Sequence, residues 1–249
     1  MLFKTKSLST ICCICVIATL LAFLPACNKE SQNPTDASYD ATLQYIQHML
    51  DEMDNDNFEE LYNDDTIDLR PNGVFAFSEP DKEYNWSCTI VEIYQLHKSM
   101  DENNQEKLCY AFYDLNQDGN DELLILSSDL TLYAIFSKDD ETTVLLDSYW
   151  SRYRGMILDS EEIYTYGTGG AEVYEYAVSR LDPPGDKLIV VDTFGFDTGD
   201  YYRKVDDVTT PISEGEFNNI LETYPDFWDR YDSQMQDLQL ELKHFEWDS

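Results

Sequence analysis

The sequence predicts an α+β protein: an antiparallel, β-rich meander, folded as a sandwich or a partial-propeller-like sheet, with an N-terminal helix and a C-terminal helix. Three observations predict this class. A helical apolar stripe begins near residue 39, short runs rich in Val, Ile, Tyr and Phe fill residues 108–206, and a helix-start signature stands at Ser213. No strand–helix–strand alternation interrupts the runs, so a parallel sheet is not expected.

The first helix is predicted by apolar residues at steps of three and four, as on one face of a helix. They are Tyr39, Leu43, Ile46, Leu50 and Met53. Acidic residues crowd residues 51–60, where the helix dipole disfavours them, so we expect fraying into a solvated loop. Residues 85–104 suit a strand by composition and a helix by spacing, and we favour the helix. Residues 37–104 are therefore expected to be mainly helical.

The β-rich body is expected over residues 105–249. Its predicted strands are separated by Asx, Gly, Pro or charged clusters and read LCYAFYDL, ELLILSS, TLYAIFS, TTVLLDSY, EIYTYG, AEVYEYAVSR, KLIVVDTF and DYYRKV. The glycine-rich stretch at 167–171 lies between two of these runs and is interpreted as a hairpin turn or bulge.

The C-terminal part begins with the clearest helix signal in the chain. Ser213 and Glu216 form a capping box, and Pro225 is expected to stop the helix. Alternating apolar residues near the end favour a closing strand, and they are Leu238, Leu240 and Leu242.

The N-terminus has the features of an export signal. Lys4 and Lys6 precede an apolar stretch, and Leu24-Pro25-Ala26-Cys27 follows it. This ending resembles the lipobox of bacterial lipoproteins, which implies a signal peptide at 1–26, a lipidated Cys27, a tether at 27–36 and one domain at 37–249. A plain secretory signal or an uncleaved anchor are the alternatives. All three place the domain outside the cytoplasm, and the lipobox reading attaches it to the membrane through the Cys27 lipid.

The net charge limits the classes of partner, and the cysteine content limits the possible disulfides. The net charge of −34 repels nucleic acid and anionic surfaces and attracts cations, although solubility alone is an alternative reason for it. Of the six cysteines, three lie in the predicted signal peptide and Cys27 would carry the lipid, so Cys88 and Cys109 remain. In an oxidising compartment they form either one disulfide or two buried thiols.

The stretch DLNQDGNDE at 114–122 has the pattern of a calcium loop. Oxygen-bearing side chains alternate up to Gly119, which permits the tight turn that places them around one ion. The predicted ligands are Asp114, Asn116, Asp118, Asn120 through its main-chain carbonyl, and Glu122. An EF-hand is excluded because its twelfth position is Ile125 and the flanks look like strands. An acidic turn that binds nothing tightly is the alternative.

With strands on both sides, this loop resembles the calcium loops of FG-GAP and VCBS-type repeats. Asp114, Asn116, Asp118, Gly119 and Leu123 match their pattern, and Glu122 stands where Asp is usual. The resemblance implies a structural calcium ion that braces a hairpin. The lipobox, this loop, the stretch YGTGGA and the Ile-Ser-x-x-Glu-Phe helix start together resemble uncharacterised lipoproteins of Gram-positive gut bacteria, a family that implies no activity.

No catalytic constellation is found in the sequence. The three histidines lie in separate segments, and Gly-x-Ser-x-Gly, Ser-x-x-Lys and His-Glu-x-x-His are absent. We therefore expect a non-enzymatic binding or adhesion module for a glycan or a surface protein. A carbohydrate-active hydrolase or accessory subunit with cleft carboxylates is the alternative. Tyr164 and Tyr166 alternate along one predicted strand, and Tyr174 and Tyr176 along the next, so each pair is expected to share one face of the sheet. These tyrosines are either core aromatics or a surface on which sugar rings stack.

Overall fold

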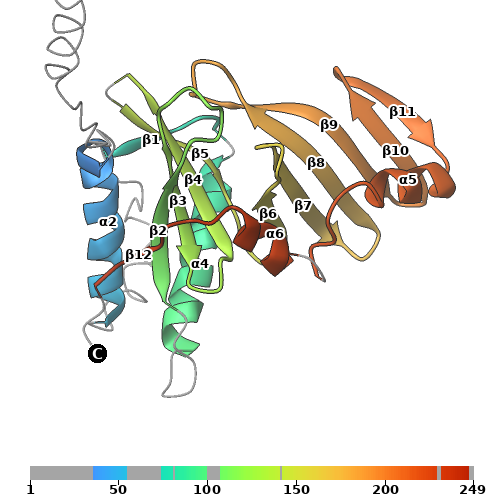
Figure 1. The fold of residues 1–249 in the computed structure, drawn as a ribbon. Coiled ribbons are helices and arrows are strands. Elements are labelled where there is room, and N and C mark those ends of the chain that lie inside the picture. Colours follow the sequence, from blue (N-terminus) through green and yellow to red (C-terminus); the bar gives the residue numbers. More distant parts are fainter. Residues whose placement is uncertain are drawn as a thin grey trace, which may run out of the picture. The chain divides into compact units, whose positions relative to one another are not determined.

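A computed structural model of the chain describes residues 36–54, 74–80, 82–99, 107–140, 142–228 and 231–246. These residues form two six-stranded sheets with helices beside them (Figure 1). The predicted α+β, β-rich class is confirmed.

The first sheet carries two helices. Its strands are β1 (Phe75–Phe77), β2 (Leu108–Tyr113), β3 (Glu122–Ser127), β4 (Leu132–Asp139), β5 (Thr142–Ser148) and β12 (Lys243–His244). They lie in the order β1-β5-β4-β3-β2-β12, with β1 parallel to β5 and the other pairs antiparallel. The helices α2 (Asp36–Asp54) and α4 (Lys82–Ser99) pack against this sheet.

The second sheet is an antiparallel meander in the order β11-β10-β9-β8-β7-β6. Its strands are β6 (Tyr153–Ile157), β7 (Ile163–Gly170), β8 (Val173–Leu181), β9 (Leu188–Asp197), β10 (Asp200–Val205) and β11 (Val208–Ile212). The helices α5 (Glu214–Leu221) and α6 (Tyr231–Asp237) follow it in the chain.

Two apolar cores cover the two faces of the first sheet. Because side chains alternate along a strand, Leu123 and Ile125 of β3 face one core, and Leu124 and Leu126 face the other. The first core joins the sheet to α2 and α4. The second joins it to the second sheet and to Phe217 of α5 and the segment that follows.

The sequence-based helices are confirmed. The helix α2 buries Tyr39, Ile46, Leu50 and Met53, and α4 spans most of the ambiguous segment. The capping box at Ser213 is present, with Glu216 reaching back to the Ser213 backbone. Of the expected frayed segment, the residues after Asp54 lie outside the described part of the chain.

Several strands differ from the expectation. The eight predicted runs form strands, and β1, β6, β11 and the short β12 were not predicted from these runs. The closing strand at residues 238–242 is wrong: these residues follow α6 without pairing, and strand pairing is limited to Lys243–His244. The left-handed backbone of Gln239, with φ of 52°, interrupts the extended conformation that the alternation predicts.

No helix in the described ranges is long and apolar enough to cross a bilayer. The predicted signal peptide and Cys27 lie outside the described residues, so lipidation stays a prediction.

Candidate functional site

The predicted calcium loop connects β2 to β3 at one end of the first sheet. Two residues in it have left-handed backbone, Gln117 with φ of 57° and Gly119 with φ of 89°. These two positions coil the chain tightly between antiparallel strands. The hairpin flanked by strands is the setting that the sequence predicted.

Hydrogen bonds draw the acidic side chains of the loop inward. The two carboxylate oxygens of Asp114 accept hydrogen bonds from the backbone N–H groups of Asp118 and Gly119, at 3.1 and 2.9 Å. Asn116 Nδ2 donates to Asp118 Oδ2 at 3.2 Å, and Asn120 Nδ2 donates to Asp118 Oδ1 at 2.9 Å. Asp114, Asn116, Asp118 and Asn120 are thus brought together.

Glu122 lies deeper than the other predicted ligands. Its Oε2 accepts from the Leu115 N–H at 2.9 Å and its Oε1 from the Ser137 hydroxyl at 3.1 Å. Burial raises the pKa of Glu122 to about 7, against the lowering effect of those two donors. Glu122 therefore ties the loop to β4, in addition to any bond to an ion.

The loop fits a weakly held hard cation. No described basic side chain pairs with Asp114 or Asp118, so their charges are uncompensated by the described protein. Among the described residues no three His, Cys, Asp or Glu side chains are grouped as a metal site. A calcium ion here would therefore depend on Asp114, Asp118 and the amide and main-chain oxygens, with Glu122 beneath them.

Cys88 and Cys109 are free thiols. Cys109 is buried and its Sγ lies 3.1 Å from His244 Nδ1 on β12. Its strand neighbours Leu108 and Tyr110 face the core under α4, so Cys109 points to the opposite face of the sheet from Cys88. The disulfide alternative is therefore not adopted, and burial raises the pKa of Cys109 to about 11.

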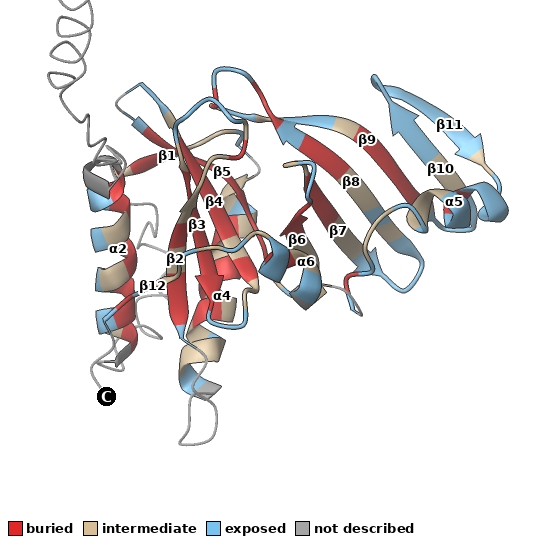
Figure 2. Cartoon of the chain, in the orientation of Figure 1, coloured by how far each residue is buried: buried red, intermediate tan, exposed pale blue. Residues whose placement is uncertain are grey.

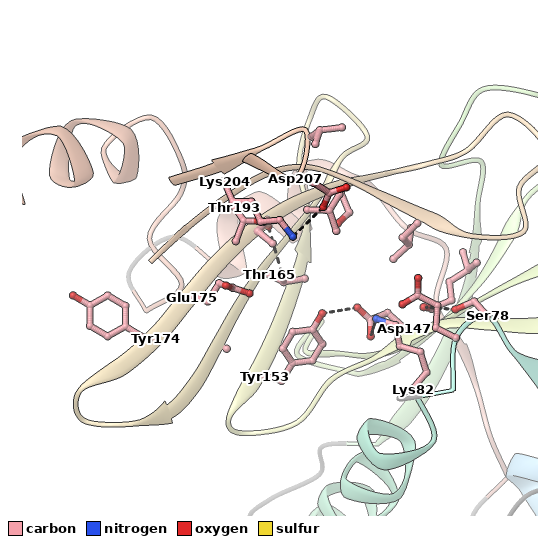
Figure 3. Close-up of a pocket in the computed structure, with 18 of the residues that line it drawn as sticks. Ser78, Lys82, Asp147, Tyr153, Thr165, Tyr174, Glu175, Thr193, Lys204 and Asp207 are labelled. Atoms are coloured by element: carbon pink, nitrogen blue, oxygen red, sulfur yellow. Dashed lines mark hydrogen bonds and ion pairs between the residues drawn. The ribbon is translucent and has the colours of Figure 1, made fainter. Parts of the chain in front are cut away.

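A groove crosses the open face of the second sheet, with a volume of about 650 Å³. Its floor consists of small side chains from three neighbouring strands: Thr165, Gly167, Ala177, Ser179 and Thr193. In Figure 3, Lys82 and Tyr153 converge on Asp147 at one side of this groove, and Glu175 projects from the sheet. The groove is far from the calcium loop in sequence and shares no lining residue with it.

Two tyrosine–carboxylate pairs stand in the groove. Tyr153 donates its hydroxyl proton to Asp147 Oδ2 at 2.7 Å, and Tyr202 donates to Glu175 Oε2 at 2.5 Å. Glycine lies beneath each ring: a Cβ on Gly167 would come within 3.3 Å of the Tyr153 ring. A Cβ on Gly195 would come within 2.9 Å of the Tyr202 hydroxyl oxygen. Both rings are therefore seated directly on the sheet.

Asp147 is the most buried charged group of the groove. Besides Tyr153 it accepts from Lys82 Nζ at 3.1 Å and from the Ser148 N–H at 3.0 Å. Burial raises the pKa of Asp147, and Lys82 and Tyr153 oppose that rise. A buried carboxylate with three donors is held in one orientation.

The charge of the groove is negative. Five acidic side chains line it, and they are Glu79, Asp147, Glu175, Asp206 and Asp207. Its two lysines, Lys82 and Lys204, are each paired with one of these acids. The lining contains no histidine and no cysteine. The arrangement suits non-covalent binding of a hydroxyl-rich or positively charged ligand.

The four tyrosines that the sequence singled out pack toward the core on the other face of this sheet, and Tyr174 also borders the groove. Tyr164 is fully buried, and the ring of Tyr176 stacks on Phe194 with a centroid distance of 5.3 Å. Tyr166 and Tyr174 are partly buried against the same core. As expected, these tyrosines share one face of the sheet. They are core aromatics, because neighbouring aromatic rings pack against their rings.

The groove residues were missed by the sequence analysis. Lys82, Asp147, Tyr153, Glu175 and Tyr202 come from five separate elements, so no local spacing connects them. One feature of the sequence could have indicated the groove: Gly195 lies within a predicted strand that is rich in β-branched and aromatic residues. Such a glycine marks a close approach by another group.

No known protein family matches the chain, and neither a curated protein nor a solved structure matches it.

Proposed function

We propose that this chain is a lipid-anchored, extracytoplasmic binding protein that is stabilised by calcium and does not catalyse a reaction. Cys27 would carry the lipid, residues 27–36 would serve as the tether, and the 114–122 loop would hold the ion. The ligand, a glycan or a surface protein, would bind in the groove of the second sheet.

The observation that carries the binding role is the pair of tyrosine–carboxylate contacts in the groove. Tyr153–Asp147 and Tyr202–Glu175 are oriented by glycines before any ligand arrives. Such preorganisation lowers the entropic cost of binding. The groove volume of about 650 Å³ is within the range of about 300–1,000 Å³ common for ligand sites.

The calcium role is supported by the coiled loop, in which no described basic side chain neutralises the carboxylates of Asp114 and Asp118. A β-hairpin braced at its turn also braces the sheet that both cores share. Extracellular calcium modules bind at about 0.1–1 mM, which suits a site with few carboxylates outside the cytoplasm.

Blocking the groove tests the binding role. The full chain in a zwitterionic detergent is screened against arrays of glycans, peptidoglycan fragments and surface proteins, beside Ala177→Trp and Val208→Trp. Ala177 lies on the groove floor, whereas Val208 is 65% exposed on β11 and outside the groove. We expect ligands whose binding is lost with Ala177→Trp and kept with Val208→Trp. An empty screen, or equal binding by both variants, would contradict the proposal.

The lipid anchor has its own test. Cys27→Ser is expected to move the protein from the membrane fraction to the soluble fraction and to remove labelling by radioactive palmitate. A membrane-bound unmodified chain that takes up no label would indicate an uncleaved anchor in place of a lipoprotein.

A glycoside hydrolase is the second candidate, favoured by one observation. Asp147 and Glu175 line the same groove, and the raised pKa of Asp147 is what a general acid requires. Hydrolysis of chromogenic glycosides that is abolished by Asp147→Asn and by Glu175→Gln would replace the binding proposal with this one.

A further inference from the structure

A second cavity of about 410 Å³ lies where the turn after β5 meets the segment between α5 and α6. We name it the tryptophan pocket. Its aromatic lining consists of Tyr133, Tyr149, Trp150, Phe227, Trp228 and Tyr231, and its charged lining of Glu92, Asp129 and Arg154. It shares no residue with the groove of the second sheet.

Trp228 is the exposed aromatic surface of this pocket. Its side chain is 61% exposed although it is one of the largest apolar groups in the chain. The Arg154 guanidinium lies over the indole ring at 4.5 Å from its centroid, and Tyr166 meets it edge-on at 6.2 Å. Asp226 accepts the Trp228 backbone N–H at 2.7 Å. The indole is therefore held in place while much of it stays open to solvent.

Arg154 offers unused hydrogen-bond donors beside this indole. It forms no hydrogen bond or ion pair with any described residue, although the chain has 50 acidic residues. A guanidinium carries five N–H donors in a rigid plane. The guanidinium stacks on the Trp228 ring.

The inner wall contains a hydroxyl group without a partner. Tyr149 is 1% exposed, and its hydroxyl has no hydrogen-bonding partner among the described residues. Gly155 permits this position, because a Cβ there would lie 2.4 Å from the Tyr149 ring. Buried hydroxyls are normally satisfied, so this hydroxyl is an unmet hydrogen-bonding group on a residue that lines the pocket.

Acceptors complete the lining. Glu92 accepts the Ser151 N–H through Oε1 at 3.3 Å, and Asp129 accepts the Thr131 N–H through Oδ1 at 3.1 Å. The second oxygen of each carboxylate is left for other donors. The pocket thus combines flat aromatic walls, guanidinium donors and carboxylate acceptors.

We infer that the tryptophan pocket binds a pyranose ring of a neutral saccharide. A pyranose has an apolar face of C–H groups, which matches the Trp228 indole, and a rim of hydroxyls, each a donor and an acceptor. The rim matches Arg154 as donor and Asp129 and Glu92 as acceptors. A peptide partner fits less well, because apolar side chains would leave these three charges unpaired.

This inference goes beyond the groove and does not depend on it or on calcium. In this inference the aromatic ring that stacks on the sugar is Trp228, which lies on a loop. The tyrosines of β7 and β8 pack in the core instead. Its failure would leave the proposed function intact, since the two sites have different variants.

The test is calorimetric titration of the full chain with maltotriose, cellotriose, laminaritriose, mannotriose and chitotriose, in a zwitterionic detergent without sugar groups. The variants are Trp228→Ala, Trp228→Phe and Arg154→Met. Val208→Ala is the matched control, because Val208 is 65% exposed and lines neither the groove nor the tryptophan pocket. Thermal unfolding of each variant confirms that it is folded.

We expect at least one trisaccharide to bind, with affinity reduced about tenfold or more by Trp228→Ala and by Arg154→Met. Trp228→Phe, which keeps an aromatic face, is expected to lose less affinity, and Val208→Ala is expected to bind as the unmodified chain does. No binding of any of the five sugars, or an equal loss with Val208→Ala, would overturn the inference.

Discussion

The two sheets of this protein are built from similar strands, yet one is covered on both faces and the other on one. In the first sheet β3 is buried at every residue, and β5 is buried from Thr143 onward. In the second sheet β10 and β11 are largely exposed, and β8 has exposed and buried residues (Figure 2). Burial on both faces makes the first sheet the main source of stability, whereas the second sheet keeps an open face, on which the proposed binding groove lies.

The largest difference in stability is expected when one apolar side chain is shortened in each sheet. Phe136 on β4 is fully buried between Phe75 and Trp86, whereas Val190 on β9 is 57% exposed. Phe136→Ala is expected to cost about 3–5 kcal/mol of the free energy of unfolding. Val190→Ala is expected to stay within about 0.5 kcal/mol. Denaturant unfolding measures both, and similar losses would contradict the division of roles.

The next largest loss of stability is expected from breaking the buried ion pair between Lys82 and Asp147, where the two sheets meet. Asp147→Ala leaves Lys82, with a side chain only 15% exposed, without its carboxylate, and we expect a loss of about 3 kcal/mol. Asp207→Ala, which removes the partner of Lys204 at the exposed rim, is the control and is expected to change nothing measurable. If the two variants unfold alike in denaturant, Asp147 does not anchor the groove.

A smaller loss of stability is expected from a substitution at Gly195, the glycine beneath Tyr202 in the second sheet. A Cβ on Gly195 would lie 2.5 Å from the Tyr174 carbonyl oxygen, so Gly195→Ala is expected to cost about 1–3 kcal/mol and to displace Tyr202. Gly215 on α5 has no atom within 4 Å of its Cβ position. Gly215→Ala is expected to gain about 0.4–1 kcal/mol, and chemical denaturation distinguishes the two signs.

The smallest effect concerns pH. Burial raises the pKa of Asp147, so the folded state binds its proton more tightly than the unfolded chain, where the pKa is about 3.9. The stability from this group is present below that value and is lost as pH rises toward the folded-state pKa. Asp147→Asn is expected to flatten the wild-type decline above about pH 4, measured by unfolding at several pH values. An unchanged slope would show that Lys82 holds the carboxylate ionised throughout.

Local features of the fold were predictable from the sequence. The stripe of α2, the capping box at Ser213 and the loop from Asp114 to Glu122 each lie within a few consecutive turns or residues. Their physical cause is local, so their spacing in the sequence records it.

Features that depend on distant segments were not predictable in the same way. The strand β1 has three residues and is a strand because it pairs with β5, 68 positions along the chain. The groove joins Lys82, Asp147 and Glu175 from different elements, and the alternating leucines near the C-terminus pack on a core without pairing. In each case tertiary contacts decide the outcome, and no short pattern contains them.

We propose that calcium at the 114–122 loop stabilises the first sheet, which is covered on both faces. Thermal unfolding of the full chain in EDTA, in calcium and in magnesium tests it, beside Asp118→Ala and Asp206→Ala, the latter an exposed acid outside the loop. With a dissociation constant of about 0.1–1 mM, calcium at about 10 mM would add about 1.4–2.7 kcal/mol.

We expect calcium alone to raise the unfolding midpoint by several degrees in the unmodified chain and in Asp206→Ala, and to have no effect on Asp118→Ala. A midpoint that neither ion moves, or an equal response by Asp118→Ala, would mean that the loop is an acidic turn without a structural ion.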